Sequence, residues 1–293
     1  MTAEAPPRVA LAQVRPGPDL DRNLDDLADM AMRARRDGAQ WLLLPEYAAM
    51  LHGSGQAMRA AADRAGEVEA AVRGLARDLG MWVLLGSLVV PDGPRRMVNR
   101  SLLFDAEGRL AARYDKLHLF DATLPDGRTI RESSAYAAGD EAVAVDTPWG
   151  RVGLSICYDL RFPGLYRALA RAGARILVVP AAFARATGAA HWHALLRARA
   201  IENGAFVLAP ATCGDSPGGR ASYGHSLALG PWGDTLGELG DEPGCLVVPL
   251  DLAAVDRVRA QLPGLAHERA FNLRLIGPSS PFPSDGMPHD TTA

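Results

Sequence analysis

Lysine is almost absent from this chain of 293 residues: its 31 basic side chains include only one, Lys116. Arginine replaces lysine in solvation and surface ion pairing, but a planar guanidinium that never loses its proton cannot replace a compact ammonium beside a reacting centre. A high-GC genome would also explain an arginine-rich composition. Lys116 nevertheless lies between two segments that carry candidate catalytic residues, so we predict a chemical role for it.

Cysteine is scarce as well. Cys157, Cys213 and Cys245 are too few and too scattered for a disulfide framework, which favours a reducing cytoplasm. No CxxC pair occurs, and His191 and His193 stand two residues apart, so a helix would point them in different directions. We therefore expect no metal.

Long apolar runs and blocks of one charge are also missing. The longest apolar runs are far shorter than the ~20 residues of a membrane helix, and the N-terminal residues do not resemble a signal peptide. We therefore expect no membrane association. The net charge of −3, without a stripe of basic residues, argues against nucleic acid as a partner. The hydrophobic share of 48% is ample for a buried core.

The order of apolar and amphipathic segments indicates an α/β protein. Strands are predicted at residues 9–14, 41–44, 81–90, 98–104, 110–114, 152–156, 175–179, 206–209, 221–229 and 245–250. Helices are predicted at residues 20–36, 57–79, 165–172, 189–202 and 252–261, and an irregular stretch at 115–141. We expect one domain over residues 1–276, with a mixed sheet or two packed sheets between helices, and a flexible Pro/Ser-rich tail over 277–293.

Three candidate catalytic residues follow predicted strands. Cys157 stands at a strand-to-helix turn, where a nucleophile is exposed, although a cysteine after an apolar strand is more often a small buried hydrophobe. Glu46 follows a buried strand and is a candidate general base, with a helix N-cap or a surface charge as the alternative. Lys116 follows the strand 110–114. A thiol needs a base and a tetrahedral oxyanion needs a positive charge, so the combination predicts a shared site at one sheet edge.

In this order, 70 and 41 residues apart, the segments around Glu46, Lys116 and Cys157 resemble the nitrilase superfamily of carbon–nitrogen hydrolases. The resemblance extends over residues 8 to about 272. The flank CYDLRFP is similar to the Nit branch of amidases, which act on ω-amides of α-keto acids; so are the segments GAAHW (188–192), LRARAIE (196–202), ASYGHS (221–226) and PWG (231–233). True nitrilases usually have Trp-Glu after the cysteine and carbamoylases Asn-Asp-Arg-Arg, and this chain has neither.

This resemblance implies the four-layer α-β-β-α sandwich of the nitrilase superfamily, assembled as a homodimer or larger homo-oligomer. It also implies hydrolysis of a primary amide of a small acid, led by deaminated glutathione and α-ketoglutaramate, without metal or cofactor. In the implied mechanism Glu46 takes the thiol proton and Cys157 attacks the amide carbonyl. Lys116 and the backbone N–H of Tyr158 then hold the oxyanion. Glu132 matches a second glutamate of the family, which would position Lys116 or the substrate amide.

Further residues are candidates for lining the substrate pocket: Tyr47, Arg161, Phe183, His191 and Trp192. Arg161 suits a substrate carboxylate, with an internal salt bridge to Asp159 as the alternative. For His191 a hydrogen-bonding role is favoured over a catalytic one. Two departures from the Nit pattern, Gly164 where Glu is common and Ala189 where Pro is common, bear on the choice of substrate.

Other functions remain open at this stage. A nitrilase or an N-carbamoyl amino acid hydrolase is the nearest alternative enzyme, and a glutaminase domain that feeds a synthetase is a weaker one. Outside enzymes, the chain could be a catalytically silent, partner-binding subunit. The presence of all the catalytic residue types argues against that role.

Overall fold

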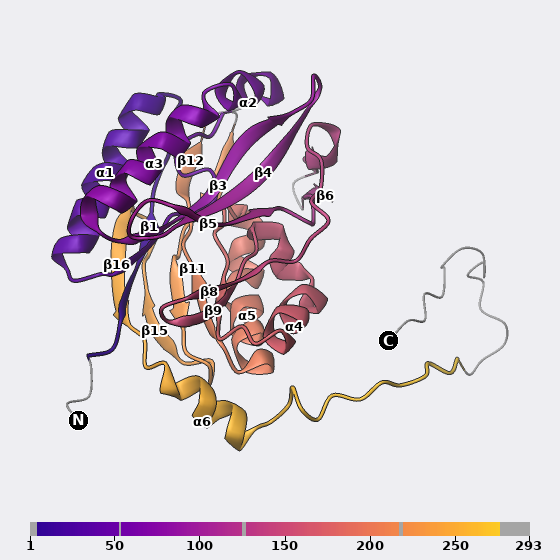
Figure 1. Ribbon diagram of the computed structural model, residues 1–293. Helices are drawn as coiled ribbons and strands as arrows, with labels where there is room; N and C mark the ends of the chain where they lie inside the picture. The colour runs from indigo at the N-terminus through magenta and orange to yellow at the C-terminus, as the bar shows by residue number, and fades with distance from the viewer. Residues whose placement is uncertain (1–4, 53, 125–126, 217–218, 276–293) are drawn as a thin grey trace.

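The computed structural model describes residues 5–52, 54–124, 127–216 and 219–275. Two six-stranded sheets face each other, and helices cover the outer face of each, so the layers follow the order α-β-β-α (Figure 1). The expected four-layer sandwich is confirmed. The predicted tail over 277–293 lies outside the described residues.

The first sheet carries the N-terminal half of the chain and one late strand. Its order is β16 (Gly244–Pro249), β1 (Arg8–Gln13), β2 (Trp41–Leu43), β3 (Trp82–Asp92), β4 (Arg96–Phe104) and β5 (Leu110–Asp115). Strands β1, β2 and β3 are parallel, whereas β16, β4 and β5 join antiparallel to their neighbours. Because two antiparallel steps separate β3 from β5, β2 and β5 run in the same direction and end at the same edge.

The second sheet carries the C-terminal half. Its order is β15 (Thr235–Glu238), β14 (Leu227–Leu229), β11 (Phe206–Ala209), β10 (Ile176–Val178), β9 (Gly150–Gly153) and β8 (Ala144–Thr147). Strands β9, β10 and β11 are parallel. Two small hairpins complete the strands: β6 (Asp121–Thr123) with β7 (Thr129–Arg131), and β12 (Cys213–Ser216) with β13 (Arg220–Tyr223).

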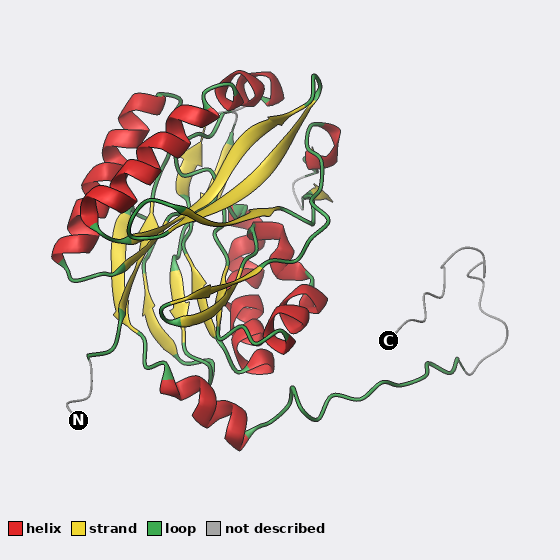
Figure 2. Ribbon diagram, viewed as in Figure 1, coloured by secondary structure: helices red, strands yellow, loops and turns green. Residues whose placement is uncertain are grey.

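Helices form the two outer layers (Figure 2). In the first half of the described chain the helices are α1 (Leu20–Arg36), α2 (Gly55–Ala62) and α3 (Ala65–Leu79). In the second half they are α4 (Pro163–Arg171), α5 (Arg185–Asn203) and α6 (Ala253–Gln261). The prediction of a helix at 20–36 is confirmed, and Asp19 caps it by accepting hydrogen bonds from two backbone N–H groups. In the described part of the chain, no helix has the length and apolar character needed to span a bilayer.

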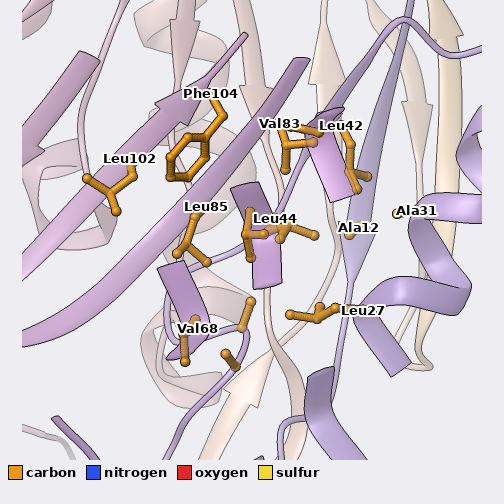
Figure 3. Close-up of a cluster of buried hydrophobic side chains, with 14 of the residues drawn as sticks. Ala12, Leu27, Ala31, Leu42, Leu44, Val68, Val83, Leu85, Leu102 and Phe104 are labelled. Atoms are coloured by element: carbon orange, nitrogen blue, oxygen red, sulfur yellow. The ribbon is translucent and has the colours of Figure 1, made fainter. Parts of the chain in front are cut away.

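Alternating side chains on the strands fill separate cores. On β2, Leu42 points outward into the cluster beneath α1 and α3. Leu27 of α1 and Val68 of α3 belong to the same cluster (Figure 3). Trp41 and Leu43, on the other face of β2, join the cluster between the two sheets. Both faces of this strand are therefore buried, which explains its continuous apolar run.

Two predicted elements are wrong in extent. The single helix expected at 57–79 is broken between α2 and α3, because Met58 of α2 packs against one core cluster and Val68 of α3 against another. The single strand expected at 221–229 is split into β13 and β14, which pair with different partners. Gly224 and His225, both at positive φ (74° and 56°), turn the chain between them.

The stretch expected to be irregular, 115–141, contains more order than predicted. The hairpin β6–β7 and a short 3-10 helix, Glu132–Ser134, lie within it. Strands β8, β12 and β15 were not predicted either. Each is only four residues long, so its side-chain alternation is too brief to stand out from a loop.

Candidate active site

The three predicted catalytic groups follow strands, but these strands belong to two different sheets. Glu46 comes after β2 and Lys116 directly after β5, at the same edge of the first sheet. Cys157 comes after β9, in the second sheet, and begins the 3-10 helix Cys157–Arg161. The prediction of a single shared sheet edge is therefore wrong, since the groups meet across the interface between the sheets.

Lys116 lies at the centre of an ion-pair cluster. Its Nζ is 3.1 Å from Glu46 Oε1 and 2.9 and 3.0 Å from the two carboxylate oxygens of Glu132. The side chain is almost fully buried. Desolvation lowers the pKa of Lys116, but attraction to Glu132 and Glu46 outweighs it, and the pKa lies well above its ordinary value. The side chain is therefore a permanent ammonium.

Cys157 has the backbone of a nucleophile elbow. Its φ of 48° is rare for a residue with a side chain and costs about 1–3 kcal/mol. The strained backbone is held by a 2.9 Å hydrogen bond from the Cys157 N–H to the carbonyl of Pro180. Such a turn after a strand directs the sulfur out of the sheet toward the other groups.

The Cys157 thiol is in contact with Glu46. Desolvation and the charge of Glu46, which is hydrogen-bonded to the thiol, raise the pKa of Cys157 well above its ordinary value, and Lys116 offsets only part of this effect. The thiol is therefore protonated at neutral pH. The group must lose its proton during the reaction, and the adjacent carboxylate is placed to accept it.

Glu46 is held by groups that sequence reasoning missed. Asn99 Nδ2 donates to Glu46 Oε1 at 3.0 Å, and the backbone N–H of Ala182 donates to Oε2 at 2.7 Å. Asn99 also donates to the hydroxyl of Tyr47 at 3.2 Å. Asn99 is fully buried in β4. The sequence carried no distinct signal for this role, because Asn99 stands beside Arg100 and Ser101 in its strand.

Glu132 is fixed by the loop that follows Lys116. Its Oε2 accepts a 2.6 Å hydrogen bond from the backbone N–H of Phe120, and its Oε1 accepts from the Tyr47 hydroxyl at 3.4 Å. Desolvation and neighbouring negative groups, among them Glu132 and Glu46, raise the pKa of Tyr47, so its hydroxyl stays neutral. Glu132 is thus part of the cluster, as expected from its match to the family.

Asp159 organises the loop around the nucleophile. This fully buried carboxylate accepts hydrogen bonds from the Ile156 N–H at 2.8 Å, the Tyr114 hydroxyl at 2.7 Å and the His118 N–H at 3.0 Å. Sequence reasoning treated Asp159 only as a potential partner of Arg161. It is instead a buried anchor for the turn that carries Cys157.

Four of the five predicted pocket residues follow Cys157 in the chain, whereas Tyr47 belongs to the cluster around Glu46 and Glu132. Arg161 lies over the rings of Phe183 and Tyr158, at 5.2 and 5.9 Å from their centroids, and its guanidinium contacts His191 Nδ1 at 3.3 Å. Across the described ranges, no carboxylate lies within 4.0 Å of this guanidinium. Trp192 is fully buried, and its ring lies against that of Phe183 with centroids 5.2 Å apart.

The two positions that depart from the Nit pattern are both exposed. Gly164 is the second residue of α4, and a Cβ built there meets no atom within 4 Å. Ala189 lies on the exposed surface of α5. Tyr158 is the second residue of its 3-10 helix, where backbone N–H groups lack partners within the helix and remain available to a ligand.

Comparison with known proteins identifies the family. The sequence model described as carbon–nitrogen hydrolase matches residues 8–260. The chain belongs to the carbon–nitrogen hydrolase family. The predicted membership of this family, and with it the prediction of a carbon–nitrogen hydrolase, is confirmed.

Relatives of this carbon–nitrogen hydrolase match over most of its length. It is 40% identical to a deaminated glutathione amidase of Yersinia enterocolitica, over 89% of this chain and 92% of the relative. It is 36% identical to the human deaminated glutathione amidase, over 90% of this chain and 82% of the human protein. Among solved structures, the Caenorhabditis elegans NitFhit protein has a TM-score of 0.86 at 36% identity, over 92% of this chain and 66% of the worm chain. An amidase from Nesterenkonia has a TM-score of 0.74 at 35% identity, over 88% of this chain and 95% of the Nesterenkonia chain.

Proposed function

We propose that this chain is a cysteine-dependent amidase. It hydrolyses an amide of a small carboxylic acid through a thioester, giving the carboxylate and either ammonia, from a primary amide, or an amine, from a secondary amide. The observation that carries the proposal is the contact of one buried ammonium, Lys116, with two carboxylates, one of which also contacts the Cys157 thiol. The names of the relatives, which are amidases, support the same reaction class.

The first half-reaction forms the thioester. Glu46 takes the thiol proton as Cys157 Sγ attacks the amide carbon, and the carbonyl oxygen becomes an oxyanion beside Lys116 Nζ and the Tyr158 N–H. The proton transfer neutralises one carboxylate while the substrate gains one negative charge, so the net charge of the cluster stays constant. Protonated Glu46 then gives its proton to the departing nitrogen, the C–N bond breaks, and ammonia or, from deaminated glutathione, cysteinylglycine leaves.

The second half-reaction releases the acid. Water attacks the thioester carbon while Glu46 accepts a proton from it. The C–S bond then breaks, and the proton on Glu46 returns to the sulfur of Cys157. Glu132 holds Lys116 by contacts of 2.9 and 3.0 Å through both half-reactions, which keeps the ammonium in place for each oxyanion.

Arg161 is the proposed contact for the substrate carboxylate. Its guanidinium lacks a carboxylate partner among the described residues and stacks over the rings of Phe183 and Tyr158, the residue that follows the nucleophile. A guanidinium without a carboxylate partner can bind a planar carboxylate of the substrate through two parallel hydrogen bonds. Deaminated glutathione leads the proposed substrates because several relatives carry that name, and α-keto ω-amides such as α-ketoglutaramate follow.

A substrate panel tests this proposal. Ammonia release is measured with α-ketoglutaramate, a neutral primary amide, a nitrile and an N-carbamoyl amino acid, and release of the amine of cysteinylglycine is measured with deaminated glutathione, each beside Cys157→Ala. We expect release from the two acidic amides and none in the variant. Preference for the nitrile or the carbamoyl compound would establish the alternative enzymes, and no release by folded protein would leave the catalytically silent subunit.

Substrate selection is tested at Arg161. Arg161→Gln should raise KM for the acidic amide about 10–100-fold, because one or two hydrogen bonds to a charged group are lost, and leave the neutral amide unaffected. Arg36→Gln, at the exposed end of α1, is the matched control. Equal losses for both amides would contradict carboxylate recognition by Arg161.

We further propose a homodimer or larger homo-oligomer in a reducing cytoplasm. The exposed apolar side chains support assembly, since Ile201 and Trp232 are 54% and 55% exposed and Phe271 is 88% exposed. The free state of the three cysteines supports the reducing compartment. Sedimentation velocity tests the assembly, and a monomer at micromolar concentration would overturn it.

A further inference from the structure

A second cluster of titratable side chains lies outside the proposed catalytic site. His193 is on α5, His225 is in the turn between β13 and β14, and Glu238 ends β15. One potential ligand atom from each lies within 4.8 Å of the other two. The expectation that the chain holds no metal considered only His191 and His193, which are neighbours in sequence. The fold brings partners to His193 from segments more than 30 residues away.

The two imidazoles converge on a single oxygen. His193 Nε2 is 2.8 Å and His225 Nδ1 is 2.9 Å from Glu238 Oε1. The ring of His225 is fixed from one side by Tyr223, which stacks on it with centroids 4.3 Å apart. Its backbone is fixed as well, because the indole N–H of Trp192 donates to the His225 carbonyl at 2.8 Å. The arrangement is therefore built from side chains that other contacts already orient.

A fourth residue faces the outer nitrogen of His225. Asp241 Oδ1 lies 3.4 Å from His225 Nε2. Histidines that bind metals commonly direct their outer N–H to a carboxylate, which leaves the inner nitrogen with a lone pair. In that tautomer the lone pair of His225 Nδ1 faces Glu238 Oε1, so that both atoms offer a lone pair to a common cation.

We propose that His193, His225 and Glu238 bind a divalent transition-metal ion of the zinc type, with water as the fourth ligand. Two imidazole nitrogens and one carboxylate oxygen form a donor set that suits Zn²⁺. Tetrahedral bonds of about 2.0–2.1 Å separate ligand atoms by about 3.3 Å, so the two contacts with Glu238 Oε1 open by only about 0.5 Å. The side chains are 36%, 22% and 34% exposed, which leaves an ion a path from solvent.

The ion would have a structural role. It would join α5 to β15 and to the turn before β14, which meet on the outer side of the second sheet. Trp192 connects this cluster to Phe183, because its indole bonds the His225 carbonyl and its ring packs on Phe183. Metal binding would therefore stabilise the segment beside the proposed substrate contact without touching the reacting atoms.

Metal titration tests the site. The full chain, treated with a chelator, is titrated with Zn²⁺ by calorimetry and with Co²⁺ by visible absorption, in the Cys157→Ala background to remove a competing thiol. We expect one ion per chain, micromolar or tighter, the strong ligand-field absorption of tetrahedral Co²⁺ and a higher melting temperature.

Two ligand variants and one control decide the outcome. His193→Ala and Glu238→Gln should each weaken binding at least about tenfold, whereas His267→Ala, at an exposed histidine outside the cluster, should bind like the parent. His193→Gln replaces His193→Ala if the latter does not fold. Binding that is unchanged in the ligand variants, or no saturable binding by the folded parent, would overturn the proposal.

Discussion

Replacement of Lys116 by arginine tests the importance of the only lysine. The variant keeps a positive charge between Glu46 and Glu132, so no buried carboxylate loses its counter-ion. The guanidinium is larger and planar, and it must fit a buried space in which the ammonium contacts three carboxylate oxygens at 2.9–3.1 Å. Overfilling a packed site costs about 1–3 kcal/mol. A typical domain stability of about 5–15 kcal/mol tolerates that loss, so the variant should fold.

The catalytic loss should be much larger than the loss of stability. Removing one donor from an oxyanion site lowers kcat by about 10²–10³, or about 2.7–4 kcal/mol. Arginine also displaces Glu46, the proposed base, because the two side chains are in direct contact. We therefore expect Lys116→Arg to lower kcat by at least about 10³, with little change in KM.

The assay is release of ammonia or amine from the best substrate of the panel, combined with thermal unfolding and titration of the Cys157 thiol. Arg113→Lys is the control, because Arg113 is exposed on β5, three residues before Lys116, and its replacement gives the chain a second lysine. This control should retain normal activity. A folded Lys116→Arg protein with kcat within a few-fold of the parent would refute the oxyanion role.

Two further predictions concern the nucleophile loop. Asp159→Asn should lower the free energy of unfolding by about 3 kcal/mol, because an amide cannot accept from all the donors that surround the buried carboxylate. Chemical denaturation measures this free energy, and a change below about 1 kcal/mol would contradict the anchoring role. The reaction of Cys157 with a small neutral thiol reagent that carries no amide should still accelerate above pH 9, since the raised pKa keeps the thiol protonated and the thiolate fraction grows about tenfold per pH unit. A rate that levels off near neutral pH would instead indicate a preformed thiolate.

Local patterns allowed the prediction of several elements. The helix at 20–36 has a cap at Asp19, an apolar stripe and basic residues in its last turn, and all of these lie within one short segment. The buried run before Glu46 likewise indicated a strand whose two faces are covered. Prediction failed where the helical pattern continued but the packing changed along the segment. The break between α2 and α3 follows from two separate core clusters.

The candidate catalytic residues could be selected from sequence because their chemistry and order are distinctive. The groups that support them could not. Asn99 and Asp159 look like ordinary polar residues in their segments, and only burial beside Glu46 and behind Cys157 gives them a function. Burial of this kind depends on how the sheets pack, which no short pattern records.

The amino-acid sequence by itself determined the residue types, the alternation of strands and helices and the single lysine next to a strand end. Only the tertiary structure decided that Cys157 approaches Glu46 and Lys116 from the opposite sheet. It also decided that His193 meets His225 and Glu238. Local structure follows from neighbours along the chain, whereas these contacts depend on the strand order and on the packing of two sheets, which the whole chain sets together.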